Sequence, residues 1–430
     1  MAASLQILCT GDVHLGRRPS RVPLDDDTLS VRSVWDRCVE TALDRQVDAV
    51  VLTGDVVDSE NQMYEAYGAL ERGIRRLVDA DVEVVAVAGN HDYEAFPRLM
   101  RSVDQDGVHL LGRGGTWETV RLNGREEDTA VRFVGWSFPE AHQYRSPLDS
   151  FSLAESEIPT LGVLHCEAGV EDGPYAPVRR EALARTPVAA WLLGHIHAPT
   201  PHREAGQLQL YPGSLQPLDP GEPGAHGAWL VDVSGQEVTA EHLPLASLRY
   251  DDAVVSVSEA DSPEAVEDAV LRTVRDRLST AGTRWPDLSH VAYRVVLEGR
   301  TNRHREIGRI VTEMVDSLRP EVDQVTGGIE AVDLQTRPAY DLETLARGDD
   351  PPGVLAQLLL RLEEGTLDRD RVQRVLRRAS KAVRRVHESS RYEPLRRDSD
   401  TREPPDDEQL RTMLYRQGLL LLDELQATRE

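Results

Sequence analysis

Residues 188–197 read VAAWLLGHIH, an apolar run that ends in two histidines one residue apart. The apolar part is typical of a buried strand, because it is short, continuous and followed directly by glycine. Each imidazole carries polar nitrogens that need partners, so a hydrophobic core has no use for the pair. We therefore interpret His195 and His197 as functional side chains at the end of a strand.

Four earlier apolar runs also end in polar residues: LQILCT precedes GDVH, VDAVVLT precedes GDVVD, VEVVAVA precedes GNHD, and TLGVL precedes HCEAG. Helical segments around Val31–Arg45 and Tyr64–Val78 lie between the early runs. Strands that alternate with helices predict an α/β domain with a largely buried sheet. The later runs QLQLYPG, GAWLVDV and EVTAEHL have no helices between them. They predict a second, more antiparallel sheet packed on the first.

The pattern changes near residue 249. Strand-like DAVVSVS, HVAYRVVLEG and GIEAVDLQT are separated by two segments with apolar residues at helical spacing, which predicts a small α/β cap domain. Beyond it the chain reads as helical, with a basic stripe on Arg371–Val386, a polar linker over 389–408 and an amphipathic helix at Leu410–Leu425. The fold class is therefore α/β: a two-sheet sandwich at 1–248, a cap at 249–345 and C-terminal helices at 346–430.

Composition limits the classes of protein that the chain can form. No run of about eighteen apolar residues exists, so we expect no membrane span. Three widely spaced cysteines, Cys9, Cys38 and Cys166, fit reduced thiols, and we expect a cytoplasmic protein. The net charge is −25, and Lys381 is the only lysine. This acidity fits either adaptation to concentrated salt or a GC-rich genome, and it argues mildly against nucleic acid as a substrate.

The polar residues after the five runs are types that bind metal ions. Open α/β sheets place ligand sites at the carboxyl ends of their strands, so these residues are expected to share one edge. Asp12 and His14 are two residues apart, as are His195 and His197, and each pair would point the same way if the chain is extended. The candidate metal ligands are Asp12, His14, Asp55, Asn90, His165, His195 and His197.

This set divides into two mixed oxygen and nitrogen sites that share Asp55. Asp12, His14, Asp55 and His197 would hold one ion, and Asp55, Asn90, His165 and His195 would hold the other. Such ligands suit manganese, iron or zinc. Two ions about 3.5–4 Å apart form the usual clamp for displacement at phosphorus. His91 is left to face the substrate as a catalytic group, and Asp92 is its candidate partner.

Other polar residues receive structural interpretations. Cys166 follows a candidate ligand but is interpreted as a packing residue, and Asp58 as a residue near the site or in solvent. The remaining histidines are interpreted as surface or hydrogen-bonded side chains: His109, His142, His202, His226, His242, His290, His304 and His387.

The ordered set GDVH, GDVVD, GNHD, LHCE and GHIH resembles the calcineurin-like metallophosphoesterase superfamily, and PGS at 212–214 extends the match. GDVHLGRR is similar to the first motif of the SbcD-type DNA repair exonucleases, the nuclease subunits of SbcCD and Mre–Rad complexes. RVVLEGRTNRH at 294–304 and LQTRPAYDL at 334–342 are similar to the cap region of the YhaO-like branch. GDVVDSEN lacks an extra histidine that some relatives carry, so Asp58 inherits no such role.

The resemblance implies a two-metal, manganese-dependent exonuclease that hydrolyses DNA phosphodiester bonds, with the seven residues as ligands and His91 facing the substrate. Two alternatives remain open: a phosphoesterase acting on small phosphodiesters or phosphomonoesters, and a subunit whose main role is partner binding. The resemblance further implies DNA and an SMC-like ATPase of the SbcC type as partners, the ATPase docking on C-terminal helices, and a homodimer. The terminal helix could equally pack on the chain's own cap domain.

Overall fold

The computed structural model describes residues 4–22, 27–58, 63–103, 106–125, 129–154, 156–258, 260–304, 306–315, 318–364, 369–387 and 406–428. The chain divides into two compact units. The first comprises residues 1–255, 268–296 and 311–333, and the second comprises residues 256–267, 297–310 and 334–430. All nine candidate site residues belong to the first unit.

The first sheet has six strands in the order β14-β13-β1-β2-β3-β4. Its bounds are β1 Leu5–Thr10, β2 Ala49–Leu52, β3 Glu83–Ala86, β4 Val108–Leu110, β13 Ala228–Ser234 and β14 Glu237–Leu243. Strands β1 to β4 are parallel, and β13 and β14 are antiparallel additions beside β1. The parallel strands read as continuous apolar runs because both faces of the sheet are covered.

The second sheet also has six strands, in the order β11-β12-β10-β7-β6-β5. Its bounds are β5 Glu118–Asn123, β6 Ala130–Trp136, β7 Thr160–His165, β10 Ala190–Gly194, β11 Thr200–Glu204 and β12 Gln207–Tyr211. Strands β6, β7, β10 and β12 run parallel, and only the two edge strands are antiparallel.

The α/β class and the two-sheet architecture are therefore confirmed, but the expected membership of the second sheet is wrong. The runs GAWLVDV and EVTAEHL form β13 and β14, which join the first sheet. QLQLYPG forms β12, which is parallel to β10. A hairpin can be read from the sequence, because its two strands are adjacent in the chain. The sheet that it joins depends on long-range pairing, here of residues 5–9 with 229–233.

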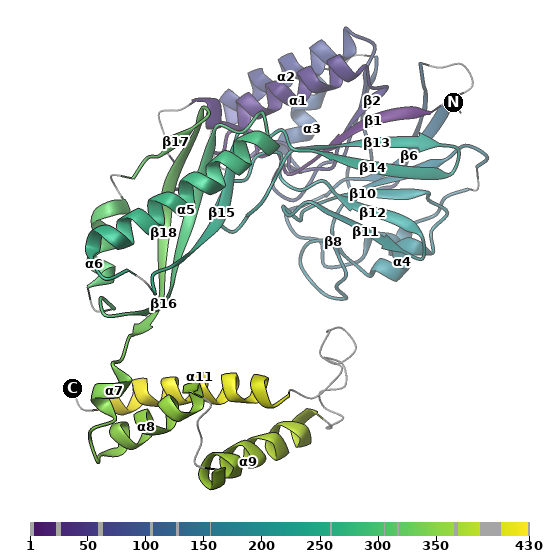
Figure 1. Ribbon diagram of the computed structural model, residues 1–430. Helices are drawn as coiled ribbons and strands as arrows, with labels where there is room; N and C mark the ends of the chain where they lie inside the picture. Colours follow the sequence, from purple (N-terminus) through teal and green to yellow (C-terminus); the bar gives the residue numbers. More distant parts are fainter. Residues whose placement is uncertain are drawn as a thin grey trace. The chain divides into compact units, whose positions relative to one another are not determined.

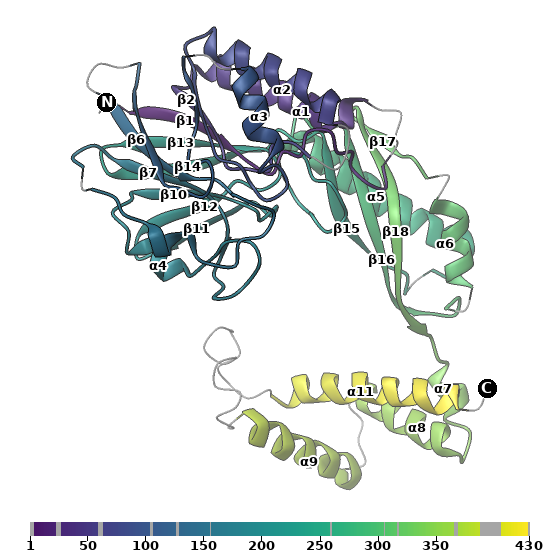
Figure 2. The same ribbon diagram turned by 180° about the vertical axis from the view of Figure 1, so that it is seen from behind.

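Helices and sheets form layers with separate cores, as Figures 1 and 2 show from opposite sides. Helices α1 Val31–Arg45, α2 Met63–Val78 and α3 Ala95–Ser102 pack on one face of the first sheet through Trp35, Leu70 and Phe96. A second core that includes Ile7 and Phe133 joins the two sheets. A third core covers the outer face of the second sheet, where α4 Arg180–Ala184 contributes Leu183. Short segments complete this unit: η1 Asp27–Leu29, η2 Pro147–Ser150, β8 Glu167–Ala168 and β9 Pro177–Val178.

A smaller sheet follows, with strands in the order β15-β16-β18-β17. Its strands are β15 Leu248–Ser256, β16 His290–Thr301, β17 Glu321–Val322 and β18 Val325–Pro338, and its helices are α5 Pro263–Arg284 and α6 Ile307–Val315. The predicted apolar face of α5 is buried, including Val270, Val274 and Leu278. Leu278 of α5 approaches β18 so closely that a Cβ atom on Gly327 would lie 2.9 Å from it. The boundaries at 249 and 346 remain a proposal.

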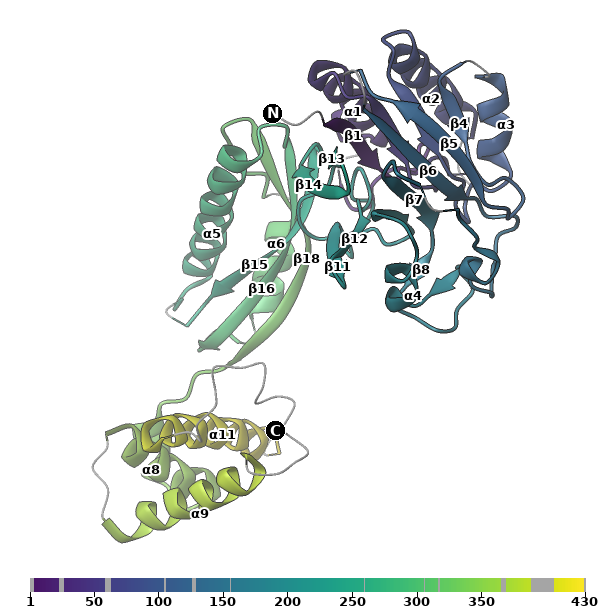
Figure 3. The ribbon, with the colours of Figure 1, turned by 90° about the vertical axis from the view of Figure 1, so that its right-hand side faces the viewer.

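The C-terminal helices are α7 Leu342–Leu345, α8 Pro351–Glu364, α9 Arg369–His387 and α11 Asp407–Ala427. Figure 1 labels all four, and Figure 3 shows α8, α9 and α11 from another side. Leu359 of α8 and Leu422 of α11 are fully buried in their common core. The predicted basic stripe of α9 is exposed at Arg378, Lys381 and Arg385, and the side chain of Arg371 lies outside the described part. Most of the predicted linker, residues 388–405, also lies outside the described residues.

No helix among the described residues is long and apolar enough to cross a membrane. Cys9, Cys38 and Cys166 are all buried and unpaired. Burial raises the pKa of the Cys166 thiol to about 12, and the side chain packs in the core of the second sheet, which supports its interpretation as a packing residue.

Candidate metal centre

The candidate ligands converge because five parallel strands end at the same place. Strands β1, β2 and β3 of the first sheet carry Asp12, Asp55 and Asn90 just beyond their carboxyl ends. Strands β7 and β10 of the second sheet carry His165 and His195 at the corresponding edge. Backbone hydrogen bonds join the loops, including those from the N–H groups of Asp12 and His14 to the loop after β2.

One group of donors consists of Asp12, His14 and His197, whose ligand atoms all lie within 4.8 Å of one another. The Nε2 atoms of His14 and His197 are 3.3 Å apart. The Nε2 atom of His197 is 3.9 Å from an Asp12 carboxylate oxygen. These three residues are three of the four expected for the first ion.

A second group contains Asp55, His165 and Asn90. The Nε2 atom of His165 lies 3.3 Å from an Asp55 oxygen and 3.0 Å from the Asn90 amide oxygen. The ligand atoms of Asp12, Asp55 and His165 also lie within 4.8 Å of one another, so the two groups adjoin. The centroid of the His195 ring lies 5.4 Å from the centroid of the His165 ring.

The local backbone differs from the expected extended conformation. Asp12, His14 and Asp55 have φ values of 46°, 49° and 49°, and His195 has a φ of 100°. Asp12 and His14 therefore do not converge through the alternation of an extended strand. Non-glycine residues in such conformations cost of order 1–3 kcal/mol each, and they persist where the surrounding structure requires them. Four of them around one cluster indicate a functional centre.

Two motif glycines are required by close approach. A Cβ atom on Gly89 would lie 2.2 Å from an Asp55 oxygen, and one on Gly54 would lie 2.6 Å from Nδ1 of His165. Gly54 also has a φ of +100°. Each glycine thus leaves room for a candidate ligand that comes from a different loop.

The donor set fits divalent metal ions. Nitrogen and oxygen ligands bind zinc at about 2.0–2.2 Å, so two ligands of one ion lie about 3–3.5 Å apart. The separations of 3.3 Å between His14 and His197, and of 3.0 and 3.3 Å around His165, fall in this range. Nδ1 of His14 is buried without a hydrogen-bond partner among the described residues. These residues can therefore hold two cations.

Burial and mutual charge shift the pKa values throughout this cluster. Burial raises the pKa of Asp12 to about 6 and lowers the pKa of His14 to about 4. Burial would also lower the pKa of His165, but the Asp55 carboxylate outweighs it and raises that pKa to about 9. The pKa of the Asp55 carboxyl is lowered, because protonated His165 outweighs desolvation. Such opposed shifts are typical of functional sites.

His91 and Asp92 lie beside these ligands in different environments. His91 is exposed, as expected of a side chain that faces a substrate, and its backbone N–H donates to Asp55. Asp92 is fully buried, and its carboxylate accepts hydrogen bonds from the N–H groups of Gly89 and Val56. Asp92 thus ties the second motif to the third. Its predicted action on the His91 ring stays a prediction.

Sequence reasoning missed Glu222 as a functional residue. Its Oε1 atom is 2.8 Å from Nδ1 of His197, and its Oε2 atom accepts a hydrogen bond of 2.6 Å from the Ser214 hydroxyl. Burial by itself would lower the pKa of His197. The hydrogen bond to Glu222 and the nearby Asp12 carboxylate outweigh burial and raise this pKa to about 9. Glu222 lies in a Gly- and Pro-rich loop that has no periodicity, so the sequence gives no direct signal for it. The nearby PGS motif at 212–214 was the only indication that this loop belongs to the site.

Of the remaining histidines, His242 departs from the predicted surface or hydrogen-bonded role, because its Nε2 atom is buried without a hydrogen-bond partner among the described residues. His109 pairs with Glu83, and His226 contacts the Ser214 hydroxyl. His202, His290 and His304 have hydrogen-bonding partners, His242 packs on Trp229, and His142 packs on Tyr175. The side chain of His387 lies outside the described part of the chain. Asp58 is buried rather than directed to solvent.

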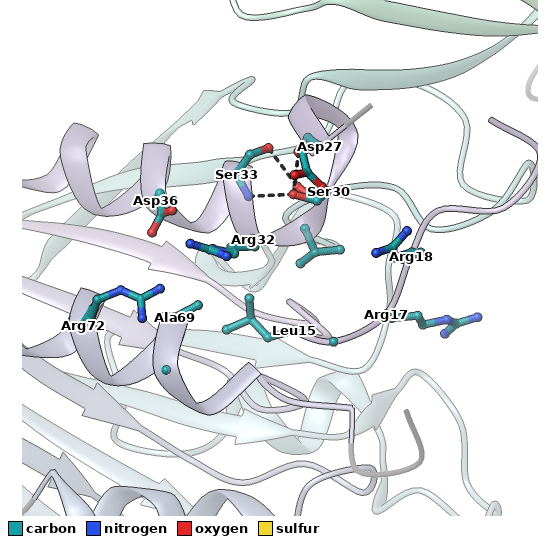
Figure 4. Close-up of a pocket in the computed structure, with 13 residues that line it drawn as sticks. Leu15, Arg17, Arg18, Asp27, Ser30, Arg32, Ser33, Asp36, Ala69 and Arg72 are labelled. Atoms are coloured by element: carbon teal, nitrogen blue, oxygen red, sulfur yellow. Dashed lines mark hydrogen bonds between the residues drawn. The ribbon is translucent and has the colours of Figure 1, made fainter. Parts of the chain in front are cut away.

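A cavity of 770 Å³ is lined in part by the loop that follows His14, although none of the candidate ligands lines it. Arg17 and Arg18 on this loop, Arg32 on α1 and Arg72 on α2 line it (Figure 4). Figure 4 shows Arg32 and Arg72 on one side and the two loop arginines on the other. Asp27 and Asp36 also contribute, so the cavity is mixed but has an excess of cationic side chains.

Comparison with known proteins identifies the fold that carries this centre. Residues 5–199 match the family of calcineurin-like phosphoesterases. Residues 5–199 therefore form a calcineurin-like phosphoesterase domain. Residues 250–337 match the middle domain of the metallophosphoesterase YhaO. Both parts of the resemblance drawn from the motifs are thus confirmed, and the phosphoesterase domain contains every candidate ligand.

Several curated proteins are similar to this chain at modest identity. An uncharacterized metallophosphoesterase, YhaO of Bacillus subtilis, is 24% identical over 61% of this chain and 62% of its own length. A DNA double-strand break repair protein Mre11 of Aeropyrum pernix is 29% identical over 54% and 58%. One of the subunits of the nuclease SbcCD of B. subtilis is 26% identical over 56% and 70%. The chain spans about three fifths of the length of the first two relatives.

Two solved structures are similar to part of this chain. TT1561 of Thermus thermophilus covers 56% of this chain and 99% of its own, at 13% identity and a TM-score of 0.35. A dimetal phosphatase from Danio rerio covers 55% and 98%, at 16% identity and a TM-score of 0.34.

Proposed function

We propose that this protein is a two-metal DNA exonuclease that uses manganese. In this proposal Asp12, His14, Asp55 and His197 hold one ion, and Asp55, Asn90, His165 and His195 hold the other. The observation that carries the proposal is the convergence of oxygen and nitrogen donors from both sheets, and a cavity lined by four arginines, one wall of which is the loop after His14, supports it. Bound ions would supply an acidified water and neutralise charge on the phosphate.

The chain's own residues would divide the remaining work. His91, exposed beside the ligands, would face the scissile phosphate and give a proton to the leaving oxygen. Asp92 would hold the loop that carries His91, because its carboxylate bridges backbone N–H groups of Gly89 and Val56. Glu222 would fix the orientation of the His197 ring, as carboxylates do for metal-binding histidines.

The arginine-lined cavity favours a polyanionic substrate over a small ester. The net charge of −25 would repel nucleic acid from an average surface of this protein. Arg17, Arg18, Arg32 and Arg72 concentrate positive charge in one cavity, one wall of which is the loop after the candidate ligand His14. Relatives named as nucleases and as DNA break repair proteins support the same substrate class.

We further propose that the protein acts in the cytoplasm with an SMC-like ATPase of the SbcC type and forms a homodimer. Helix α11 packs on α8 through Leu422, and Asp423 pairs with Arg300 at 3.0 Å, so part of the helix serves internal packing. Met413 and Leu421 on the same helix are 48% exposed, which leaves apolar surface for a partner.

The test is hydrolysis by the full chain with Mn²⁺, at salt concentrations from low to molar. Linear end-labelled DNA should lose terminal nucleotides, whereas closed circular DNA should be more resistant. The His165→Ala variant should lose this activity, because it removes a ligand of the second ion. Turnover of small aryl phosphodiesters alone, with linear DNA intact at every salt concentration, would contradict the nuclease proposal.

A matched control distinguishes the loss of a metal ligand from the general effect of replacing a partly buried histidine. His109 lies outside the cluster and contacts Glu83, so His109→Ala should keep DNA hydrolysis within about twofold of the unaltered protein. Equal losses in the two variants would mean that His165 acts through stability rather than through metal binding.

A further inference from the structure

Four aromatic rings form a continuous series that starts at the metal centre and ends in solvent. We call them the aromatic ladder: His195, Tyr175, His142 and Tyr144. The successive ring centroids are 4.8, 6.0 and 6.3 Å apart. The angles between successive ring planes are 40°, 27° and 18°, so the outer rings are close to parallel.

Exposure of the rings increases along this series. His195 and Tyr175 are partly buried, and His142 is exposed. Tyr144 is 71% exposed, and among the described residues it is the only aromatic one of the exposed large hydrophobic side chains. A single exposed ring is common on protein surfaces. An exposed ring that stacks on a series of rings leading to a candidate metal ligand is better explained as part of a binding surface.

Local stability does not account for the outer rings. Backbone hydrogen bonds hold their loop to the segment that carries Tyr175: the Gln143 N–H donates to the Pro174 carbonyl at 2.7 Å, and the Ala176 N–H donates to the Gln143 carbonyl at 2.8 Å. Gln143 and Tyr175 also form a parallel β-bridge. The loop is therefore attached without the side chains of His142 and Tyr144, and a ring that is mostly in water gains little from burial.

We propose that the two outer rings of the aromatic ladder, His142 and Tyr144, bind unpaired nucleobases of the strand whose phosphodiester lies at the metal centre. This inference rests on the proposed nuclease function and extends it to the form of the substrate. Bases stack on aromatic side chains without regard to sequence, because every base has a π-face. A ladder of this kind selects a frayed or single-stranded end over a paired one, and over a small ester that has no bases.

The experiment uses the full chain with Mn²⁺ and three substrates. They are a single-stranded oligonucleotide, an abasic oligonucleotide of equal length and charge, and a small aryl phosphodiester. Tyr144→Ala should raise KM for the base-bearing strand about tenfold, the typical cost of one lost stacking contact. KM for the abasic strand, and turnover of the small ester, should stay within about twofold.

Two variants serve as controls. Tyr144→Phe keeps the ring and should restore KM for the base-bearing strand. Arg145→Ala removes an exposed neighbouring charge and should weaken base-bearing and abasic strands to the same extent. Tyr175 is left unaltered, because its ring packs directly on His195.

Several results would overturn the inference. An unaltered protein that handles the base-bearing and abasic strands alike would show that no bases are bound. An equal loss on all three substrates in Tyr144→Ala would assign Tyr144 a structural role in its loop. Hydrolysis of the small ester without any digestion of DNA by the unaltered protein is a different outcome, because it defeats the nuclease proposal and the ladder together.

Discussion

At the metal centre Asp12 and His165 are fully buried, whereas on helix α11 Leu421 is 48% exposed. The centre takes charged groups out of water, where they must compensate one another or bind a cation. The C-terminal helices keep their charged stripe in water and expose apolar side chains as well. Burial of charged groups, as at the metal centre, is rare unless they are paired, whereas single exposed apolar residues, as on α11, are common. The comparison therefore assigns chemistry to the first region and leaves the second available for contact.

The largest expected effect follows from removing Asp55, the carboxylate that the proposal assigns to both ions. Asp55→Asn keeps the size of the side chain, but it leaves protonated His165 without its carboxylate. We expect loss of bound manganese and a fall of at least about a thousandfold in kcat/KM for a small aryl phosphodiester. Metal content after gel filtration and steady-state kinetics measure the two effects. Full activity in chelator-treated protein would show that the centre is not catalytic.

His91→Ala tests whether chemistry and metal binding can be separated within the centre. His91 is exposed and lies outside both donor groups, so manganese occupancy should remain unchanged. Turnover should fall by about 10²–10⁴-fold, the usual contribution of a positioned proton donor. If manganese is lost together with activity, His91 is a ligand and its proposed role is wrong.

Glu222→Gln should have a smaller effect, because it alters a residue that acts through His197. We expect manganese affinity to fall by about 10–100-fold, with turnover restored at saturating metal. Titration of the metal-free protein followed by calorimetry gives the affinity. A loss of turnover that saturating metal does not restore would contradict a purely positioning role.

Manganese affinity should rise with pH. His165 and His197 have pKa values of about 9 in the metal-free protein, above the usual 6.5, and both must lose a proton to bind metal. Affinity should increase by up to about tenfold per pH unit for each proton until pH 9. The stabilisation that these protonated histidines give the metal-free protein is complete below about pH 6.5 and is lost as pH rises through 9. Affinity that is constant from pH 6 to 9 would contradict these pKa values.

The smallest effect is expected on α11, where two neighbouring leucines form a matched pair. Leu421→Ser should change the free energy of unfolding of the helical region by no more than about 0.5 kcal/mol, because the side chain is exposed. Leu422→Ala should destabilise it by about 2–5 kcal/mol, because that side chain is fully buried against α8. Thermal denaturation monitored by circular dichroism measures both. Hydrolysis of a small ester should be normal in each, and a loss in Leu421→Ser would link α11 to the centre.

The sequence by itself determined the local elements and the chemistry of the site. Apolar runs such as LQILCT marked the strands, and Val31–Arg45 is a helix with the predicted bounds. The seven candidate ligands could be named because oxygen and nitrogen donors followed successive strands, and parallel strands end at one edge of a sheet. Periodicity and residue type are local properties, and they can be read without any knowledge of distant contacts.

Only the tertiary structure decided which distant segments meet. It placed β13 and β14 beside β1, brought Glu222 to His197 across 25 positions, and held Asp12 and His14 in left-handed conformations. It also stacked His142 and Tyr144 in series with a candidate ligand. These features arise from pairing between residues far apart in the chain, whose free energy depends on the packing of the whole domain and leaves no regular signal in the sequence.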